Sequence, residues 1–524
     1  MGRTQKSIKN IAYAFGAQGV TTLFNFITKS IIARLLGNQI VALNGLFTEI
    51  IACLSLAELG IGSAIVFNLY KPLAENDHEK VSQLMTFFKQ AYRLIAVAVM
   101  GMGTIACFFI QFIIKEDITY PLWYVRVIFM LFVLNSACSY LFSYKISLLN
   151  ADQKVYIYSF YSTLFYIVRT TINIIVLLLL NKYGDDYSYI LYLSISIVTT
   201  LISNYLISRQ VDKRYTYLKN MPLPKEDKKN VFDNVKNIFI KELSGKITNS
   251  TDNILISMLV STIMVAPNQF YTTLTGIFMN LIFQVEAGIR ASMGNLFALG
   301  TGKECSRVVN RLTWGYAIFA IWGCTGLYVC SESFIRVWVG EQYLYEDKIL
   351  FIILINLFCY IICKPIYTAM HVSGLFKEGR NISILGSVIN LIVSIVLGKA
   401  WGIIGIFLGT FCTYVIQTIM KIYYVYKLKF KSSSWPYSLR MLMYSGLFAA
   451  CMFGCKKLTD FCVVGNRIEN EIGRDILQFV INGAVSTVVV IIVTVVCFSR
   501  TEEFKYYIGL ITGYLKKNKA KAND

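Results

Sequence analysis

The sequence predicts an all-α integral membrane protein with about fourteen transmembrane helices. Of its 524 residues, 56% are hydrophobic and only 15% are charged, and its mean hydropathy is +0.56. Soluble globular chains carry about 45–50% apolar and about 25% charged residues. One bilayer crossing needs about 20 apolar residues, and stretches of that length follow one another along most of the chain. The segments between them are too short for a sizeable soluble domain.

The apolar stretches, read with the polar residues that interrupt them, define the spans in order. They lie at roughly 10–33, 43–69, 88–114, 122–144, 155–180, 188–208, 235–261, 268–297, 312–338, 349–370, 382–398, 402–426, 438–455 and 477–499. The first span follows three basic residues, Arg3, Lys6 and Lys9, and is longer than the core of a cleavable signal peptide. We therefore expect it to remain in the membrane as the first helix.

The positions of Lys and Arg predict the orientation of these spans. The formal net charge is +20, which in a soluble chain would suggest nucleic acid as a partner. Here the basic residues gather in alternate loops, and 29 of the 50 Lys and Arg residues lie in the segments placed on the inner side. The positive-inside rule puts both termini in the cytoplasm. We predict a multi-pass membrane protein that contacts membrane lipids and no nucleic acid.

Two short segments recur at helices that are six spans apart. IKNI (8–11) opens the first span and VKNI (235–238) the seventh, while INIIV (172–176) lies in the fifth and INLIV (389–393) in the eleventh. Because six is even, both copies begin in the cytoplasm, so the two halves are related by an axis along the membrane normal. The predicted parts are a six-helix lobe at 1–208, a basic cytoplasmic linker at 209–232, a second six-helix lobe at 233–426, and two extra spans with a basic tail at 427–524.

Cysteine and histidine do not indicate a metal site. The thirteen cysteines lie mostly in apolar stretches without CxxC pairs, as small buried residues do. The two histidines, His78 and His371, have no nearby cluster with metal-ligand spacing. We predict no cofactor and no bound metal, apart from a coupling ion such as H⁺ or Na⁺.

Four segments resemble one family of transporters. They are AELGIGSAIVFNLYKPLAENDHEKVSQLM (57–85), TKSIIARLLG (28–37), YLFSYKISLLNADQKVYI (140–157) and TDNILISMLVS (251–261). In order and spacing they resemble bacterial Wzx-type polysaccharide flippases, which serve O-antigen, capsule or teichoic-type polymers and belong to the MATE-like multidrug/oligosaccharidyl-lipid/polysaccharide exporters. The resemblance covers about residues 1–430, and the last two spans match only in number and hydropathy.

The resemblance implies a function as well as a fold. It implies two lobes around a central cavity that opens alternately to each side of the membrane. The cargo would be a polyprenyl-diphosphate-linked oligosaccharide, moved from the inner to the outer leaflet for cell-surface polysaccharide synthesis. Glycosyltransferases and a polysaccharide polymerase would then be partners of the pathway.

Such a cargo needs a cationic path, because its headgroup carries a diphosphate. Ionisable residues inside spans usually face a cavity or a partner. Arg169 in the fifth span and Lys29 in the first have no acidic residue three or four positions away. Arg169 is the stronger candidate because guanidinium binds phosphate bidentately. The alternative role for Arg169 is an interhelical ion pair, for example with Glu58.

The seventh and eighth spans contain cations that have a carboxylate four residues away. Glu242 and Lys246 stand at i,i+4, as do Glu286 and Arg290, so each couple is expected to pair along its own helix. Lys246 and Arg290 remain candidates for the second lobe's half of the cavity.

Acidic residues in spans are candidates for ion coupling or gating. Asp252 has Asn249, Ser250 and Asn253 beside it, so its carboxylate is suited to carry H⁺ or to help hold Na⁺. The other candidates for coupling or gating are Glu49, Glu58 and Glu286. Packing is the alternative role for each.

Two other function classes remain open. A multidrug or organic-cation antiporter of the same superfamily would need an acidic cavity, and the spans hold both signs of charge nearly in balance. A membrane polysaccharide polymerase would expose a large outer loop with acidic, Arg or His groups, whereas the largest predicted outer loop, 456–475, contains no His. The chain has no P-loop, GxSxG or HExxH motif, so we expect that it is not an enzyme.

Overall fold

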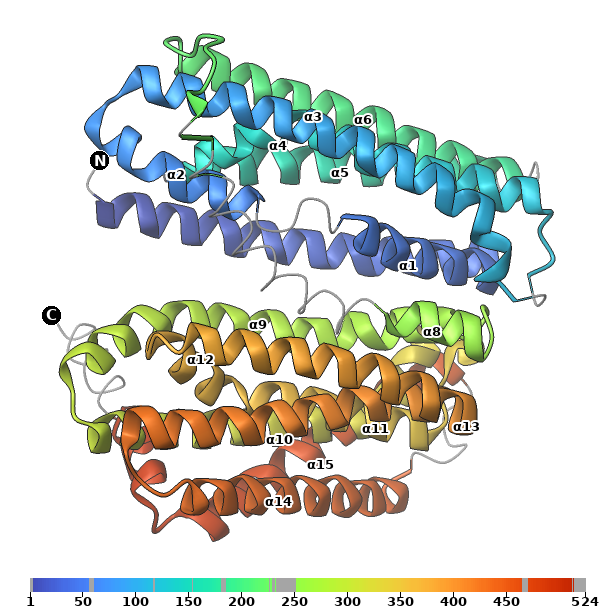
Figure 1. Ribbon diagram of the computed structural model, residues 1–524. Helices are drawn as coiled ribbons and strands as arrows, with labels where there is room; N and C mark the ends of the chain where they lie inside the picture. Colours follow the sequence, from blue (N-terminus) through green and yellow to red (C-terminus); the bar gives the residue numbers. More distant parts are fainter. Residues whose placement is uncertain are drawn as a thin grey trace, which may run out of the picture. The chain divides into compact units, whose positions relative to one another are not determined.

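The computed structural model describes residues 3–55, 61–115, 118–152, 154–180, 185–225, 227, 228, 231, 251–463, 470–510 and 512. Over these residues the chain is built from helices joined by turns, without a strand. It divides into two compact units, Met1–Gln269 (unit 1) and Phe270–Asp524 (unit 2). The predicted all-α class is confirmed, and Figure 1 shows each unit as a bundle of long helices.

Unit 1 contains the helices of the first half of the chain. These are α1 (Arg3–Leu54), α2 (Ile61–Glu75), α3 (His78–Phe109), the 3-10 turn Ile110–Phe112, α4 (Leu122–Ala151), α5 (Val155–Leu180), α6 (Asp185–Arg214) and α8 (Asp252–Leu259). Within α1, Gly37 has φ 75° and ψ −175°, so α1 consists of two helices that meet at this glycine. This left-handed φ favours glycine, because glycine has no Cβ that would clash with the backbone. The loop that we predicted between the first two spans is thus only the tight reversal of the chain at Gly37.

Unit 2 contains the second set of helices. These are α9 (Val265–Leu299, which begins at the end of unit 1), α10 (Gly302–Trp338), α11 (Asp347–Ile362), α12 (Lys364–Val372), α13 (Phe376–Tyr424), the π-helical turn Val425–Phe430, α14 (Trp435–Phe461) and α15 (Glu471–Phe498). The predicted tenth span is divided at Cys363, where α11 ends and α12 begins. The sequence reading gave no break at that position.

Helix α13 is a hairpin of two closely packed arms. The chain reverses at Gly402, which has φ 60° and ψ −136°. Across the arms, Ser394 donates a hydrogen bond to the carbonyl of Ile406 over 3.0 Å. A Cβ on Gly405 would overlap the carbonyl oxygen of Leu397. Small residues therefore let the two backbones approach closely, as they commonly do between membrane helices.

The helices account for the predicted number of spans. Ten helices of the described chain are long and apolar enough to cross a membrane. Two of them, Gln18–Leu54 and Phe376–Phe430, contain the reversals at Gly37 and Gly402 and so supply two spans each. Helices α2, α8 and α9 supply parts of the second, seventh and eighth spans. The chain is therefore a multi-pass membrane protein with about fourteen transmembrane helices.

The segment after α6 packs against unit 1. The backbone N–H of Lys219 donates to Ser82 on α3 over 3.3 Å, and that of Met221 donates to Thr86 over 3.1 Å. The Tyr215 hydroxyl donates to Asp152 over 2.6 Å. Burial and the Asp152 carboxylate raise the pKa of Tyr215. The first part of the predicted linker is thus hydrogen-bonded to the helices that precede it.

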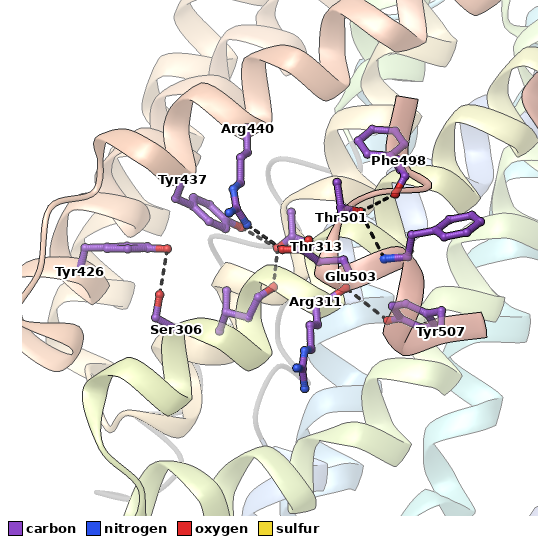
Figure 2. A network of polar contacts seen from close by, with 12 residues as sticks. Ser306, Arg311, Thr313, Tyr426, Tyr437, Arg440, Phe498, Thr501, Glu503 and Tyr507 are labelled. Atoms are coloured by element: carbon purple, nitrogen blue, oxygen red, sulfur yellow. Dashed lines mark hydrogen bonds and ion pairs between the residues drawn. The ribbon is translucent and has the colours of Figure 1, made fainter. Parts of the chain in front are cut away.

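A short helix at 502–510 follows α15 and packs on α10 and α14 (Figure 2). Glu503 forms an ion pair with Arg440 of α14 at 2.8 Å. Tyr507 stacks on Trp314 of α10, with ring centroids 5.2 Å apart. A Cβ on Gly315 would lie 2.6 Å from the Tyr507 hydroxyl, so this glycine makes room for the tyrosine.

Candidate functional site

Arg169 borders a polar cavity between α5 and α6 of unit 1. The cavity has a volume of about 230 Å³. Its lining is rich in hydroxyl and aromatic groups and consists of Tyr158, Ser162, Phe165, Tyr166, Arg169, Thr199, Thr200, Ser203 and Asn204. The Arg169 guanidinium lies 5.2 Å from the centre of the Tyr166 ring, and no carboxylate of the described chain lies within ion-pair distance of it. The cavity therefore offers one cation among neutral hydrogen-bonding groups.

The proposed alternative partner of Arg169, Glu58, lies outside the described residues, as do Lys246 and its expected partner Glu242. The interhelical ion pair and the Glu242–Lys246 pair therefore stay predictions.

Lys29 contacts the region where α9 begins. Its ammonium group donates a hydrogen bond to the backbone carbonyl of Gln269 over 3.1 Å. The second helix of α1 meets the same residue, because a Cβ on Gly45 would lie 2.6 Å from the Gln269 side chain. The turn after α8 is also held, since Thr262 accepts a hydrogen bond from the N–H of Lys115 over 2.8 Å. Lys29 thus belongs to a set of contacts that fasten α8 and the start of α9 to unit 1.

Two of the candidate carboxylates come together in unit 1. Asp252 begins α8, and its charge interacts with that of Glu49 on the second helix of α1. The Oδ1 atom of Asp252 is buried and has no hydrogen-bond partner in the described part of the chain. A carboxylate in this situation is suited to take up a proton or a cation.

Unit 2 contains a cluster of charges centred on the buried side chain of Glu286. Arg290 lies 2.8 Å from Glu286, so the pairing expected along α9 is present. Lys364 of α12 also lies 3.6 Å from Glu286, and Thr368 donates a hydrogen bond to it over 3.0 Å. The side chain of Glu286 is only 10% exposed. The carboxylate is thus shared by two cations from two helices.

Lys421 adds a third cation from α13. It is 7% exposed and lies close enough to Lys364 for the two charges to repel each other. Its ammonium group donates to the side-chain oxygen of Gln417 over 3.2 Å and lies 3.3 Å from the centre of the Tyr367 ring. No carboxylate of the described chain forms an ion pair with it. The cluster therefore holds three cations and one carboxylate.

The sequence reading missed Lys364 and Lys421, although a signal was present. Each lies in a predicted span and has no acidic residue three or four positions away, which is the criterion that selected Arg169. Applied to every span, that criterion finds both residues. The ion pair of Lys364 with Glu286 and the closeness of Lys421 to Lys364 are tertiary features that spacing along one helix does not show.

Comparisons with known proteins identify the fold. No protein-family model and no curated protein sequence matches the chain. The structure of a lipid II flippase MurJ in an inward closed conformation is 17% identical, with a TM-score of 0.66, and the match covers 93% of this chain and 99% of that one. An inward-facing MATE multidrug transporter of the MOP superfamily is 13% identical, with a TM-score of 0.61, and the match covers 79% and 96%. The MATE transporter VcmN of Vibrio cholerae is 12% identical, with a TM-score of 0.56, and the match covers 82% and 98%.

These likenesses concern the arrangement of the helices. The chain has the fold that MurJ and the MATE transporters share, as the sequence resemblance implied. The proteins with these similar structures are transporters and a flippase. The MurJ match extends over a larger share of this chain than the MATE matches do.

Proposed function

We propose that the protein is a flippase for polyprenyl-diphosphate-linked oligosaccharides, which it moves from the inner to the outer leaflet of the bacterial cytoplasmic membrane by alternating access. In this proposal, glycosyltransferases supply the lipid-linked sugar and a polymerase uses it after transport. The observation that carries the proposal is the cluster in which Arg290 and Lys364 share the carboxylate of Glu286 and Lys421 lies close to Lys364. The match to the fold of a lipid II flippase supports it.

The cluster contains more positive than negative charges among the described residues. A buried ion is expensive to desolvate unless an opposite charge and hydrogen bonds compensate. Lys364, whose side chain is 16% exposed, shares Glu286 with Arg290, whose side chain is 45% exposed. The buried Lys421 contacts a neutral amide and an aromatic ring. A diphosphate would supply the missing negative charge, and charge-assisted hydrogen bonds to phosphate are among the strongest available to a protein.

The Arg169 cavity supports the proposal from unit 1. Its serine, threonine and asparagine side chains can hydrogen-bond to sugar hydroxyls, and its tyrosines offer faces on which sugar rings stack. Arg169 adds a bidentate donor for phosphate or for an acidic sugar. Each unit thus contains a cationic, polar set of groups of the kind that an anionic glycolipid requires.

Transport by the purified protein in vesicles tests the proposal. A labelled polyprenyl-diphosphate oligosaccharide is placed in one leaflet, and its appearance in the other is measured. We expect Lys421→Met to slow transport at least about tenfold, because a hydrogen bond to a charged group contributes about 1.5–3 kcal/mol. Lys399→Met, which changes an exposed lysine of α13, should transport normally. Normal transport by Lys421→Met would contradict the role of the cluster.

A second candidate function is supported by Glu49 and Asp252. Two neighbouring carboxylates favour the binding of a positively charged ligand, so an antiporter of organic cations remains the alternative to the flippase. In the flippase we propose that this pair binds the coupling H⁺ or Na⁺. Asp252→Asn should then remove the dependence of glycolipid transport on an ion gradient. Gradient-driven uptake of a fluorescent organic cation, with no movement of the glycolipid, would favour the antiporter.

A further inference from the structure

A second polar cavity lies at one end of unit 2, where α10 and α14 end and α15 begins. Its volume is about 260 Å³. Twelve side chains of these three helices and their ends line it, and half of them are charged. The helices α14 and α15 are the two extra spans, so this cavity exists only because they pack on α10.

One charged side chain of the cavity, Arg336, forms ion pairs within the protein. Arg336 of α10 lies 3.1 Å from Glu332 and 3.3 Å from Glu341, so it joins two carboxylates. This arrangement fixes the wall of the cavity that α10 contributes.

The groups from α14 and α15 are less well satisfied. Lys456 lies 3.7 Å from both Asp347 and Asp460, which is beyond hydrogen-bonding distance. Arg474 and Asp475, near the start of α15, line the cavity without an ion-pair partner in the described part of the chain. The cavity therefore presents charged groups of both signs, Lys456, Arg474 and Asp475, to whatever occupies it.

The position of the cavity restricts the class of ligand. The cavity lies where α10 and α14 end and α15 begins, and its lining reaches Val329 and Asn482, about three turns into α10 and α15. The ends of membrane-spanning helices lie at the depth of the lipid headgroups. Large apolar side chains flank the cavity and are exposed: Phe461 is 92% exposed, Ile472 58% and Ile476 50%. A lipid would place its headgroup in the cavity and its chains along these residues.

We propose that this cavity binds the headgroup of a zwitterionic phospholipid whose ammonium group carries hydrogens, that is, a phosphoethanolamine headgroup. Lys456 and Arg474 bind the phosphate, and Asp475 accepts hydrogen bonds from the ammonium group. A quaternary ammonium has the same charge but no N–H, so it would leave Asp475 without a donor. The site is separate from the Glu286 cluster and does not depend on the cargo that the protein transports.

The test compares lipids that differ only in the headgroup. The purified full-length protein in detergent is titrated with phosphatidylethanolamine, phosphatidylcholine or phosphatidylglycerol of identical acyl chains, and bound lipid is measured by native mass spectrometry. We expect phosphatidylethanolamine to bind about tenfold more tightly than the other two, the value of one hydrogen bond to a charged group. Asp475→Asn should remove this preference, whereas Arg474→Ala, which removes a donor to the phosphate that all three lipids share, should weaken the binding of each of them. Lys457→Ala, which changes an exposed neighbour that does not line the cavity, should keep it.

Three results would overturn the proposal. Equal binding of phosphatidylethanolamine and phosphatidylcholine would show that the ammonium hydrogens are not recognised. A preference that survives Asp475→Asn, or lipid binding that Arg474→Ala leaves unchanged, would place the lipid elsewhere. Free glycerophosphoethanolamine binding as tightly as the whole lipid would make the ligand a soluble zwitterion instead of a membrane lipid.

Discussion

Asn173 and Asn390 form the same interhelical hydrogen bond, one in each unit. Asn173 of α5 donates to Ser196 of α6 over 3.0 Å, and Asn390 in the first arm of α13 donates to Thr410 in the second over 3.1 Å. Both asparagines are buried, and the Oδ1 atom of each has no hydrogen-bond partner among the described residues. They occupy the same place in the INIIV and INLIV segments. The internal repeat is therefore visible in the contacts of the two bundles.

This equivalence predicts that the two asparagines contribute similarly to stability. Asn173→Ala and Asn390→Ala should each lower the free energy of unfolding by about 0.6–1.7 kcal/mol, the range measured for hydrogen bonds between membrane helices. Asn150→Ala, at an exposed position, should have no effect. Thermal unfolding in detergent measures all three. A large loss for one asparagine and none for the other would argue against equivalent roles.

The close packing of the two arms of α13 predicts that the stability of the protein depends strongly on Gly405. A Cβ there would overlap the backbone carbonyl oxygen of Leu397, and backbone atoms give way less easily than a flexible side chain. We expect Gly405→Ala to destabilise the protein by about 1–3 kcal/mol. Gly446→Ala in α14, where nothing lies within 4 Å of the new Cβ, is the matched control. Equal melting temperatures of the two variants would disprove the close packing of the arms.

The Arg169 cavity predicts a transport defect without a folding defect. Arg169→Ala should slow glycolipid transport at least about tenfold, while the protein stays in the membrane at a normal level. Arg169→Lys should restore transport in part, since a point charge keeps the attraction but loses the bidentate geometry. Arg209→Ala, at an exposed position of α6, serves as the control. If Arg169→Ala disappears from the membrane, an ion-pair role for Arg169 is favoured instead.

The predicted orientation is testable with a cysteine that the protein already has. Cys462, just after α14, is exposed, and the distribution of Lys and Arg places it outside. A membrane-impermeant maleimide added to intact cells should label the protein, and Cys462→Ser should remove that label. In the Cys462→Ser background, Lys225→Cys should be labelled only after the cells are opened. Labelling of Lys225→Cys in intact cells would contradict the fourteen-span orientation.

Hydropathy predicted the spans well because a membrane demands long apolar helices. The reversal at Gly402 falls at the predicted boundary between spans 382–398 and 402–426. The reversal at Gly37 falls within the predicted first loop, but the helices continue up to it. Hydropathy does not show this difference, because Arg34, Asn38 and Gln39 beside Gly37 lower the local hydropathy as a loop does, although the backbone on either side of Gly37 is helical.

The candidate site was only partly predictable, for a physical reason. The pairing of Glu286 with Arg290 follows from their spacing on one helix. The approach of Lys364 to Glu286 depends on how α12 packs against α9, and the position of Lys421 depends on where the second arm of α13 lies. Spacing along a helix specifies contacts of that helix alone, whereas charges from several helices meet through tertiary packing.

The reversal at Gly402 also has a consequence for the way the protein enters the membrane. The two arms of α13 meet without a polar loop, and the exposed side chains beside the turn include Lys399 and Trp401. Insertion of the pair therefore carries very little hydrophilic chain across the bilayer. Because the contacts at Gly405 join neighbours in sequence, they can form as soon as both arms have left the ribosome. The hairpin is thus suited to enter the lipid as one unit during synthesis.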